Sequence, residues 1–143
     1  MRRNEPVTGH EREYPAHYHL ITTTDLKGKI TAANEEFAEV AGYSIDELVG
    51  QPHNLIRHPD MPPEAFANLW ETIRKGDSWR GMVKNRCKNG DFYWVSAYVT
   101  PVTENGKVVG YESVRSCPDR EDVERAEKLY ASIRAGKSGV PLW

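Results

Sequence analysis

The sequence predicts an α+β fold: a five-stranded antiparallel sheet with short helices packed on one face, plus a C-terminal helix. Two short β-branched segments come first, between residues 19 and 33. A run of short helical segments extends to residue 76, and three strand-like segments then follow with no helix between them. Strands joined by short turns pair antiparallel, and helices inserted between the second and third strands must cover a face of the sheet.

The composition favours one soluble globular domain. The chain has 143 residues, of which 38% are hydrophobic and 28% charged, and its formal net charge is −2. This length supports one core, and the near-neutral charge predicts no binding to nucleic acid. We expect no signal peptide and no membrane span, because no long apolar run occurs. The two cysteines, with no CxxC spacing, fit a reduced, cytoplasmic setting.

The first two strands are predicted at 19–25 and 29–33. The stretch HLITTTD is rich in β-branched residues, the turn DLKG follows, and KITAA has the length of a hairpin partner.

The next two helices carry recognisable caps. Asn34 stands at an N-cap position before two glutamates, and Gly42 stops the helix that it begins. Ser44 and Glu47 form a capping box, which predicts a second short helix that Gly50 ends.

A longer amphipathic helix is predicted over 62–76. Its apolar residues are spaced at i, i+3, i+4 and i+7, namely Phe66, Leu69, Trp70 and Ile73. Three strands follow, at 79–88, 91–102 and 107–116. The Asn89-Gly90 pair between the first two is typical of a tight hairpin turn.

The last helix is predicted from Pro118-Asp119 to about residue 135. Its apolar side chains step by three and four, as in a short heptad stripe, at Val123, Ala126, Tyr130 and Ile133. On the strand predicted at 91–102, Tyr93 and Trp94 are neighbours, so strand alternation predicts that only one of them is interior.

Residues 19–117 resemble a PAS domain. The resemblance depends on an asparagine that opens the first helix and on the motifs GYSIDELVG, KNGDFYWV and GKVVGYESVR. The stretches GQPHNLIRHPDMP and WRGMVKNRCKNGDFYWV are more specific, and they are similar to the N-terminal PAS domain of bacterial aerotaxis receptors. That family binds FAD non-covalently and senses redox state. The resemblance continues through LYASIRAGK, which in the family leads towards a membrane anchor and a HAMP module.

The resemblance implies three parts of the chain: an N-terminal cap (1–18), a PAS sensor domain (19–117), and a C-terminal signalling helix and linker (118–143). It also implies a homodimer formed through the cap or the C-terminal helix, and a HAMP or other signalling module as partner. The domain would lie on the cytoplasmic side of the inner membrane, held there through an anchor that this chain lacks.

Flavin-binding light-oxygen-voltage photosensors share the PAS fold and carry a reactive cysteine soon after the GY...E..G block. Here the stretch QPHNLI has no cysteine, and Cys87 falls on a strand that does not match. We therefore expect no cysteinyl–flavin photocycle.

The stretch PHNLIRHPDMP (52–62) is dense in polar chemistry. A guanidinium and an imidazole suit pyrophosphate or adenine, and the resemblance implies that Arg57, His58 and Asp60 help to hold FAD. The alternative is that Asp60 caps the following helix, with Pro62 in its first turn and the two cations exposed.

Asn85 and Arg115 are the candidates for contact with the flavin ring. Asn85 shares a strand face with small and apolar residues, and a buried amide there needs a partner. By resemblance, it matches a photosensor asparagine that contacts the ring, and Arg115 falls near a glutamine beside flavin N5. An inward Arg115 would favour an anionic reduced flavin. The alternatives are a cross-strand bond for Asn85 and an outward Arg115.

Three further residues are candidates that also have structural roles. Trp70 fits the apolar helix stripe, whereas Trp79 lies at a strand entrance and is equally suited to the core or to stacking against the cofactor. Asn34 is a helix cap first, and by resemblance it also supports the pocket.

Together these observations predict a non-enzymatic redox or oxygen sensor, the sensory input module of an aerotaxis or chemotaxis receptor, with FAD as cofactor. No nucleophile–base pair stands out. His53 and His58 are five residues apart without a third ligand, so no metal site is expected. Two alternatives stay open: a haem-based gas sensor, and a cofactor-free dimerisation module that uses the heptad stripe.

Overall fold

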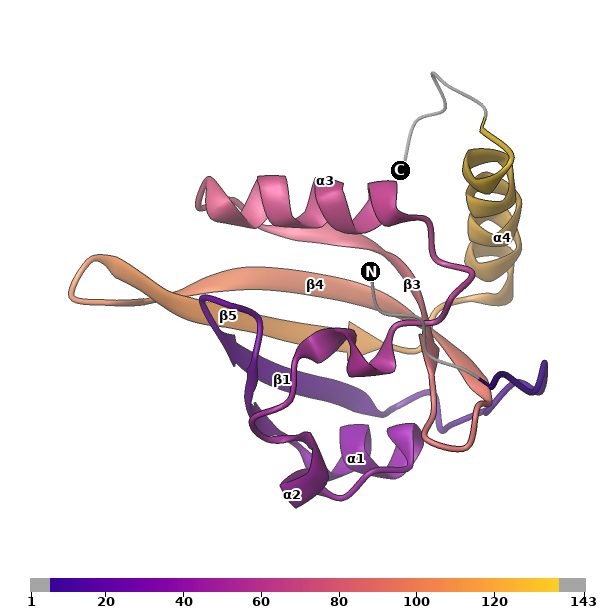
Figure 1. Cartoon of the computed structure of the whole chain (residues 1–143), viewed down its shortest axis with the longest axis horizontal. Coiled ribbons are helices and arrows are strands. Elements are labelled where there is room, and N and C mark those ends of the chain that lie inside the picture. Colours follow the sequence, from indigo (N-terminus) through magenta and orange to yellow (C-terminus); the bar gives the residue numbers. More distant parts are fainter. Residues whose placement is uncertain (1–5, 137–143) are drawn as a thin grey trace.

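A five-stranded antiparallel sheet is the frame of the computed structural model, which describes residues 6–136 (Figure 1). The strand order is β2-β1-β5-β4-β3. The strands are β1 (His19–Asp25), β2 (Ile30–Ala33), β3 (Trp79–Arg86), β4 (Phe92–Glu104) and β5 (Lys107–Ser116). The central strand β5 pairs with β1 from Ser116 to Gly110, and it thereby joins the β1–β2 hairpin to the β3–β4 hairpin.

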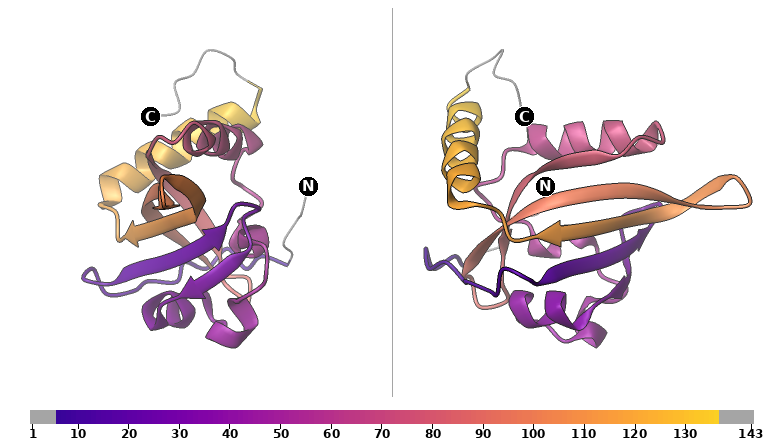
Figure 2. Two further views of the ribbon diagram at one scale, coloured as in Figure 1. Left: turned by 90° about the vertical axis from the view of Figure 1, so that its left-hand side faces the viewer. Right: turned by 180° about the vertical axis from the view of Figure 1, so that it is seen from behind.

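The helices lie on both sides of this sheet. They are α1 (Glu35–Ala41), α2 (Ile45–Leu48), the 3-10 helix η1 (His53–Ile56), α3 (Pro63–Arg74) and α4 (Arg120–Arg134). The segment from α1 to α3 connects β2 to β3 and covers one face, here called the inner face (Figure 1). Helix α4 follows β5 and covers only one end of the opposite, outer face (Figure 2).

The predicted caps are confirmed. Asn34 Oδ1 accepts a hydrogen bond from Phe37 N at 3.0 Å, and Gly42 ends α1 with a φ of 79°. Ser44 and Glu47 form the predicted capping box of α2. These elements depend on contacts within one turn of helix, which explains why the sequence alone predicts them.

The apolar stripe of α4 is buried against the outer face. Its four predicted residues are all buried, and the Tyr130 ring stacks on Trp94 with centroids 6.3 Å apart. The Tyr130 hydroxyl also donates to the Met82 carbonyl oxygen at 2.5 Å. The apolar stripe of α4 therefore packs against the sheet of its own chain. The prediction that only one of Tyr93 and Trp94 is interior is wrong, because α4 covers the face on which Trp94 lies.

The N-terminal segment lies along the β3–β4 hairpin. Thr8 N donates to the Gly90 carbonyl at 3.0 Å, and Arg12 N donates to the Phe92 carbonyl at 2.7 Å. The Glu11 carboxylate pairs with Arg120 at the start of α4, at 3.0 Å. Residues 1–5 of the predicted cap and 137–143 of the predicted linker lie outside the described residues.

Candidate ligand-binding cavity

A cavity of about 370 Å³ lies between the inner face of the sheet and the helical segment above it. The strand residues that line it alternate along β3, β4 and β5, as side chains on one face must. From the sheet these are Val83, Asn85, Ala97, Val99, Tyr111, Ser113 and Arg115. The turn after β1, the 3-10 helix η1 and the inner side of α3 supply most of the rest.

Arg115 is a buried cation on the floor of this cavity. Its side chain is tied to β1, because the guanidinium donates to the Leu20 carbonyl at 3.2 Å and to Thr22 Oγ1 at 2.9 Å. Burial lowers the pKa of Arg115 to about 10, which still leaves the group charged near neutral pH. The inward orientation considered from the sequence is the observed one.

His53, the first residue of η1, contacts Arg115 directly. Arg115 Nη2 lies against His53 Nε2, and Thr22 Oγ1 is 3.1 Å from the same nitrogen. Since a guanidinium only donates, Nε2 accepts, and the neutral ring carries its proton on Nδ1. Burial, and then the charge of Arg115, lower the pKa of His53 to about 3, so the imidazole is neutral near pH 7.

Asn85 presents an unsatisfied amide to the cavity. The residue is 3% exposed, and within the part of the chain that the structure describes its Nδ2 has no hydrogen-bond partner. The hydroxyl of Tyr93, which faces Asn85 across the strand pair, has none either. Burial raises the pKa of that hydroxyl, while the positive charge of Arg115 and then the Asn85 side chain act in the opposite sense. An unmet buried donor costs about 1–3 kcal/mol, which favours a ligand that supplies the acceptor.

Arg57 lines the cavity from the segment that follows η1. Its guanidinium carbon lies 3.8 Å from the centroid of the Phe66 ring, and burial lowers its pKa. The backbone of Arg57 forms an antiparallel bridge with Asn85. The segment 57–61 therefore runs along the edge of β3, with Arg57 on the cavity side.

His58 and Asp60 lie outside the cavity lining, so the direct contact with a cofactor predicted for them has no support in the geometry. His58 is buried against the ring of Phe92, and its Nδ1 accepts from Asp60 N at 3.0 Å. Burial lowers the pKa of His58 to about 4, with the Lys84 charge as the next cause. The alternative that Asp60 caps α3 is wrong, because Pro62 is the N-cap residue and no side chain caps this helix.

Asp60 instead joins its own segment to β3 and to α4. Its carboxylate pairs with Lys84 on β3 at 2.9 Å, and its carbonyl oxygen accepts from Arg134 near the end of α4. Met61 Sδ accepts from Lys84 N at 3.3 Å. Segment 57–61 thus contacts the cavity through Arg57 and helix α4 through Asp60.

The remaining predicted residues differ in position. Trp70 lines the cavity, and its ring meets that of Tyr111 edge to face at 5.8 Å. Trp79 does not line it, because its side chain is buried and its indole N–H donates to Asn68 Oδ1 on α3 at 2.8 Å. Asn34 also lies outside the lining, and it ties α1 to β1 by accepting from Ile21 N at 3.1 Å.

The sequence did not identify His53 as a site residue. It lies in the polar stretch 52–62, but its side chain reaches Arg115 only because η1 turns it towards β5. Those two residues are 62 positions apart, so no local pattern reveals the contact.

Two properties hold for residues 6–136 as a whole. No three His, Cys, Asp or Glu side chains among them are grouped to hold a metal ion. None of the helices in this range is long and apolar enough to cross a membrane.

The five-stranded sheet, its helical cover and the cavity between them define a class of domain. Comparison with known proteins identifies this class. The PAS fold family matches residues 30–115, and the chain belongs to this family. Over 119 residues it is 50% identical to the aerotaxis receptor of Escherichia coli (strain K12), a match that covers 83% of this chain and 24% of the receptor. The chain thus spans about a quarter of that relative's length.

Two further likenesses agree with this assignment. The chain is 34% identical over 82 residues to the nitrogen fixation regulatory protein of Klebsiella pneumoniae, covering 57% of this chain and 17% of that protein. A light-oxygen-voltage domain studied with a flavin analogue has the same fold, with a TM-score of 0.68 and 19% identity over 83% of this chain and 89% of that one. The chain is a PAS sensory module, as the sequence motifs predict.

Proposed function

We propose that this chain binds FAD non-covalently in the inner-face cavity and serves as the redox-sensing input module of an aerotaxis or chemotaxis receptor. The observation that carries the proposal is the floor of the cavity, where the unsatisfied amide of Asn85 lies on the same face as the buried cation Arg115. The likeness to the aerotaxis receptor supports it.

The residues present fit a flavin. The ring system is flat and largely apolar, and its pyrimidine edge bears carbonyl oxygens that the Asn85 amide nitrogen can reach as a donor. When bound, a flavin supplies reversible electron uptake. Arg115 would stabilise negative charge on such a ring, and the neutral His53 holds the guanidinium in place without adding a second charge.

Segment 57–61 provides a route from the cavity to the C-terminal helix. A change in the hydrogen bonds at Asn85 acts on β3 and on the bridged backbone of Arg57. Asp60, three residues later, holds both Lys84 and Arg134. The output is a shift in the packing of α4 or the N-terminal cap, which alters a homodimer and a HAMP or equivalent signalling module on the cytoplasmic side of the inner membrane.

An absorbance spectrum of the purified full chain tests the proposal. Flavin bands that dithionite bleaches would support it. A Soret band would support a haem-based gas sensor, with His53 as the imidazole in the cavity, and a colourless protein would support a cofactor-free dimerisation module. Release of the cofactor by heat, followed by chromatography, distinguishes FAD from FMN and non-covalent from covalent attachment.

A further inference from the structure

The cavity lining carries charge of one sign only. It includes four cationic side chains, from Lys27, Arg57, Arg74 and Arg115, and no carboxylate. The chain as a whole has 19 Lys and Arg against 21 Asp and Glu. Such a local excess in a weakly acidic chain indicates an anionic ligand.

Two of these cations lie at the rim of the cavity. Lys27, in the turn between β1 and β2, and Arg74, in the last turn of α3, are both exposed. Among residues 6–136, neither is paired with a carboxylate. The carboxylate of Asp25, on the same turn as Lys27, accepts from the backbone amides of Lys27 and Lys29 at 2.9 Å each. The side-chain charges of Lys27 and Arg74 therefore remain available to a ligand.

The turn and the helix meet across this rim. In Figure 1 the β1–β2 turn lies below the C-terminal half of α3. A Cβ added to Gly28 would lie 3.3 Å from the Trp70 ring, which shows how closely the two elements approach. The Arg74 guanidinium lies 5.1 Å from the centroid of the same ring. The Trp70 ring thus contacts Arg74 and closely approaches the turn that carries Lys27.

The rim also offers an apolar surface. Leu26 lines the cavity and yet is 52% exposed. The cavity itself, at about 370 Å³, is near the lower end of the ~300–1,000 Å³ typical of cofactor and drug sites. A dinucleotide whose ring lies at Asn85 and Arg115 would extend along the same lining to its exposed part, where Leu26, Lys27 and Arg74 lie.

We propose that the rim formed by Leu26, Lys27, Trp70 and Arg74 binds the diphosphate and adenosine half of FAD and makes the site prefer FAD to FMN and riboflavin. This inference rests on the proposed function. Lys27 and Arg74 contact the phosphates, and Leu26 and the Trp70 ring provide the apolar surface for adenine.

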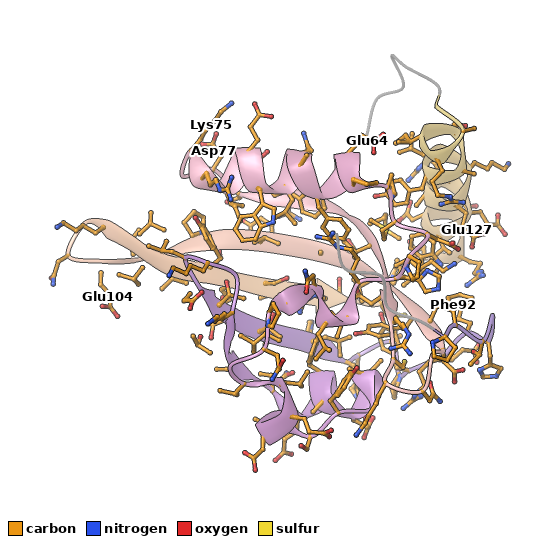
Figure 3. The ribbon with its side chains drawn as sticks, in the orientation of Figure 1. Glu64, Lys75, Asp77, Phe92, Glu104 and Glu127 are labelled. Carbon is orange, nitrogen blue, oxygen red and sulfur yellow. The ribbon has the colours of Figure 1, made fainter. Side chains whose placement is uncertain are left out.

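Calorimetric titration of the full chain, freed of flavin, with riboflavin, FMN and FAD tests the inference. The variants are Lys27→Gln, Arg74→Gln and the double substitution. Lys75→Gln is the matched control, because Lys75 adjoins Arg74 in the chain, lies outside the lining and points away from the sheet (Figure 3). Each titration is run at low and at raised salt, since exposed charges are screened.

We expect the unaltered chain to bind FAD at least about tenfold more tightly than riboflavin, with FMN between them. Each single variant should weaken FAD binding by about tenfold at low salt and change riboflavin binding by less than about twofold, as in the control. Equal affinity of the unaltered chain for FAD and riboflavin would overturn the inference and leave the proposed function standing. Equal losses of FAD and riboflavin in the double variant would overturn it as well. If none of the three flavins binds, the proposed function fails and the inference fails with it.

Discussion

Asn85→Leu should make the flavin-free protein more stable and its cofactor binding weaker. Asn85 is 3% exposed, and its amide nitrogen has no hydrogen-bond partner among residues 6–136. Leaving such a donor unmet costs about 1–3 kcal/mol, and a leucine of similar size removes that cost. For a chain of this length, ~1 kcal/mol corresponds to about 2–4 °C in Tm, so removal of a cost of about 1–3 kcal/mol should raise the Tm by about 2–12 °C.

The same substitution removes the donor that we assign to the flavin pyrimidine edge. Loss of one buried hydrogen bond, with an unmet acceptor left on the ligand, should lower flavin affinity by about 10- to 100-fold. Thermal unfolding followed by circular dichroism measures the first effect on flavin-free protein. Calorimetric titration with FAD measures the second on the same preparation.

Asn68→Leu is a control of the same chemical type with the opposite expected sign. Asn68 Oδ1 accepts from the buried indole N–H of Trp79 at 2.8 Å, so its replacement leaves a buried donor unpaired and should lower the Tm. If Asn85→Leu also lowers the Tm while flavin affinity stays unchanged, the amide is a structural group and the assignment of the cavity floor is refuted.

Three other substitutions test separate features. The pKa of His53 is about 3 in the folded chain against 6.5 for the free side chain, so unfolding takes up a proton below pH 6.5 and stability should fall as the pH drops from about 6.5 towards 3. In urea titrations at several pH values, His53→Gln should flatten this dependence of stability on pH, whereas an unchanged dependence would exclude His53 as its source. Gly28→Ala places a side chain at a φ of +88° and 3.3 Å from the Trp70 ring, so we expect a loss of about 1–2 kcal/mol in urea unfolding and slower FAD association in stopped-flow experiments; wild-type values for both would contradict the close approach. Tyr130→Phe removes the hydrogen bond to the Met82 carbonyl, so it should cost about 1 kcal/mol and expose α4 to limited proteolysis, and an unchanged cleavage rate would show that this bond does not hold the helix.

The sequence predicts the fold well because the ends of its helices and strands are determined by residues that are close together in the chain. The Asn34 cap and the Ser44–Glu47 capping box each depend on residues three positions apart, and both occur as expected. The Asn89-Gly90 turn likewise places β3 and β4 as neighbours. The order of strands and helices follows from such elements, and the PAS motifs agree with it.

The site is less predictable because its contacts are distant in the chain. Asn85 and Arg115 could be assigned to the interior from strand alternation, and the structure places both in the cavity lining. His58 and Asp60 are only one and three residues from Arg57, but the chain turns them to the other side of β3. Their polar side chains predicted a ligand-binding site near this segment. Only the path of residues 57–61 shows that they hold the segment on β3 and α4 and do not line the cavity.

The burial of Trp94 could not be predicted for a similar reason. Alternation on β4 places Trp94 and Tyr93 on opposite faces of the sheet. In a sheet covered on one side only, the face that carries Trp94 would be exposed. Helix α4 packs on that face, where its own apolar residues are removed from water and Tyr130 stacks on Trp94. A pattern typical of a dimer seam is here part of the core.

The position of Asp60, between the cavity wall and α4, has a thermodynamic consequence. Any ligand whose binding alters the hold of Asp60 on Arg134 changes the free energy of docking α4. Linkage requires the reverse effect to be equal, so a partner that captures α4 alters the affinity of the cavity for its ligand by the same factor. Cofactor affinity measured on the isolated chain would then differ from that in a full assembly, and the ratio of the two reports the coupling energy without any assay of signalling.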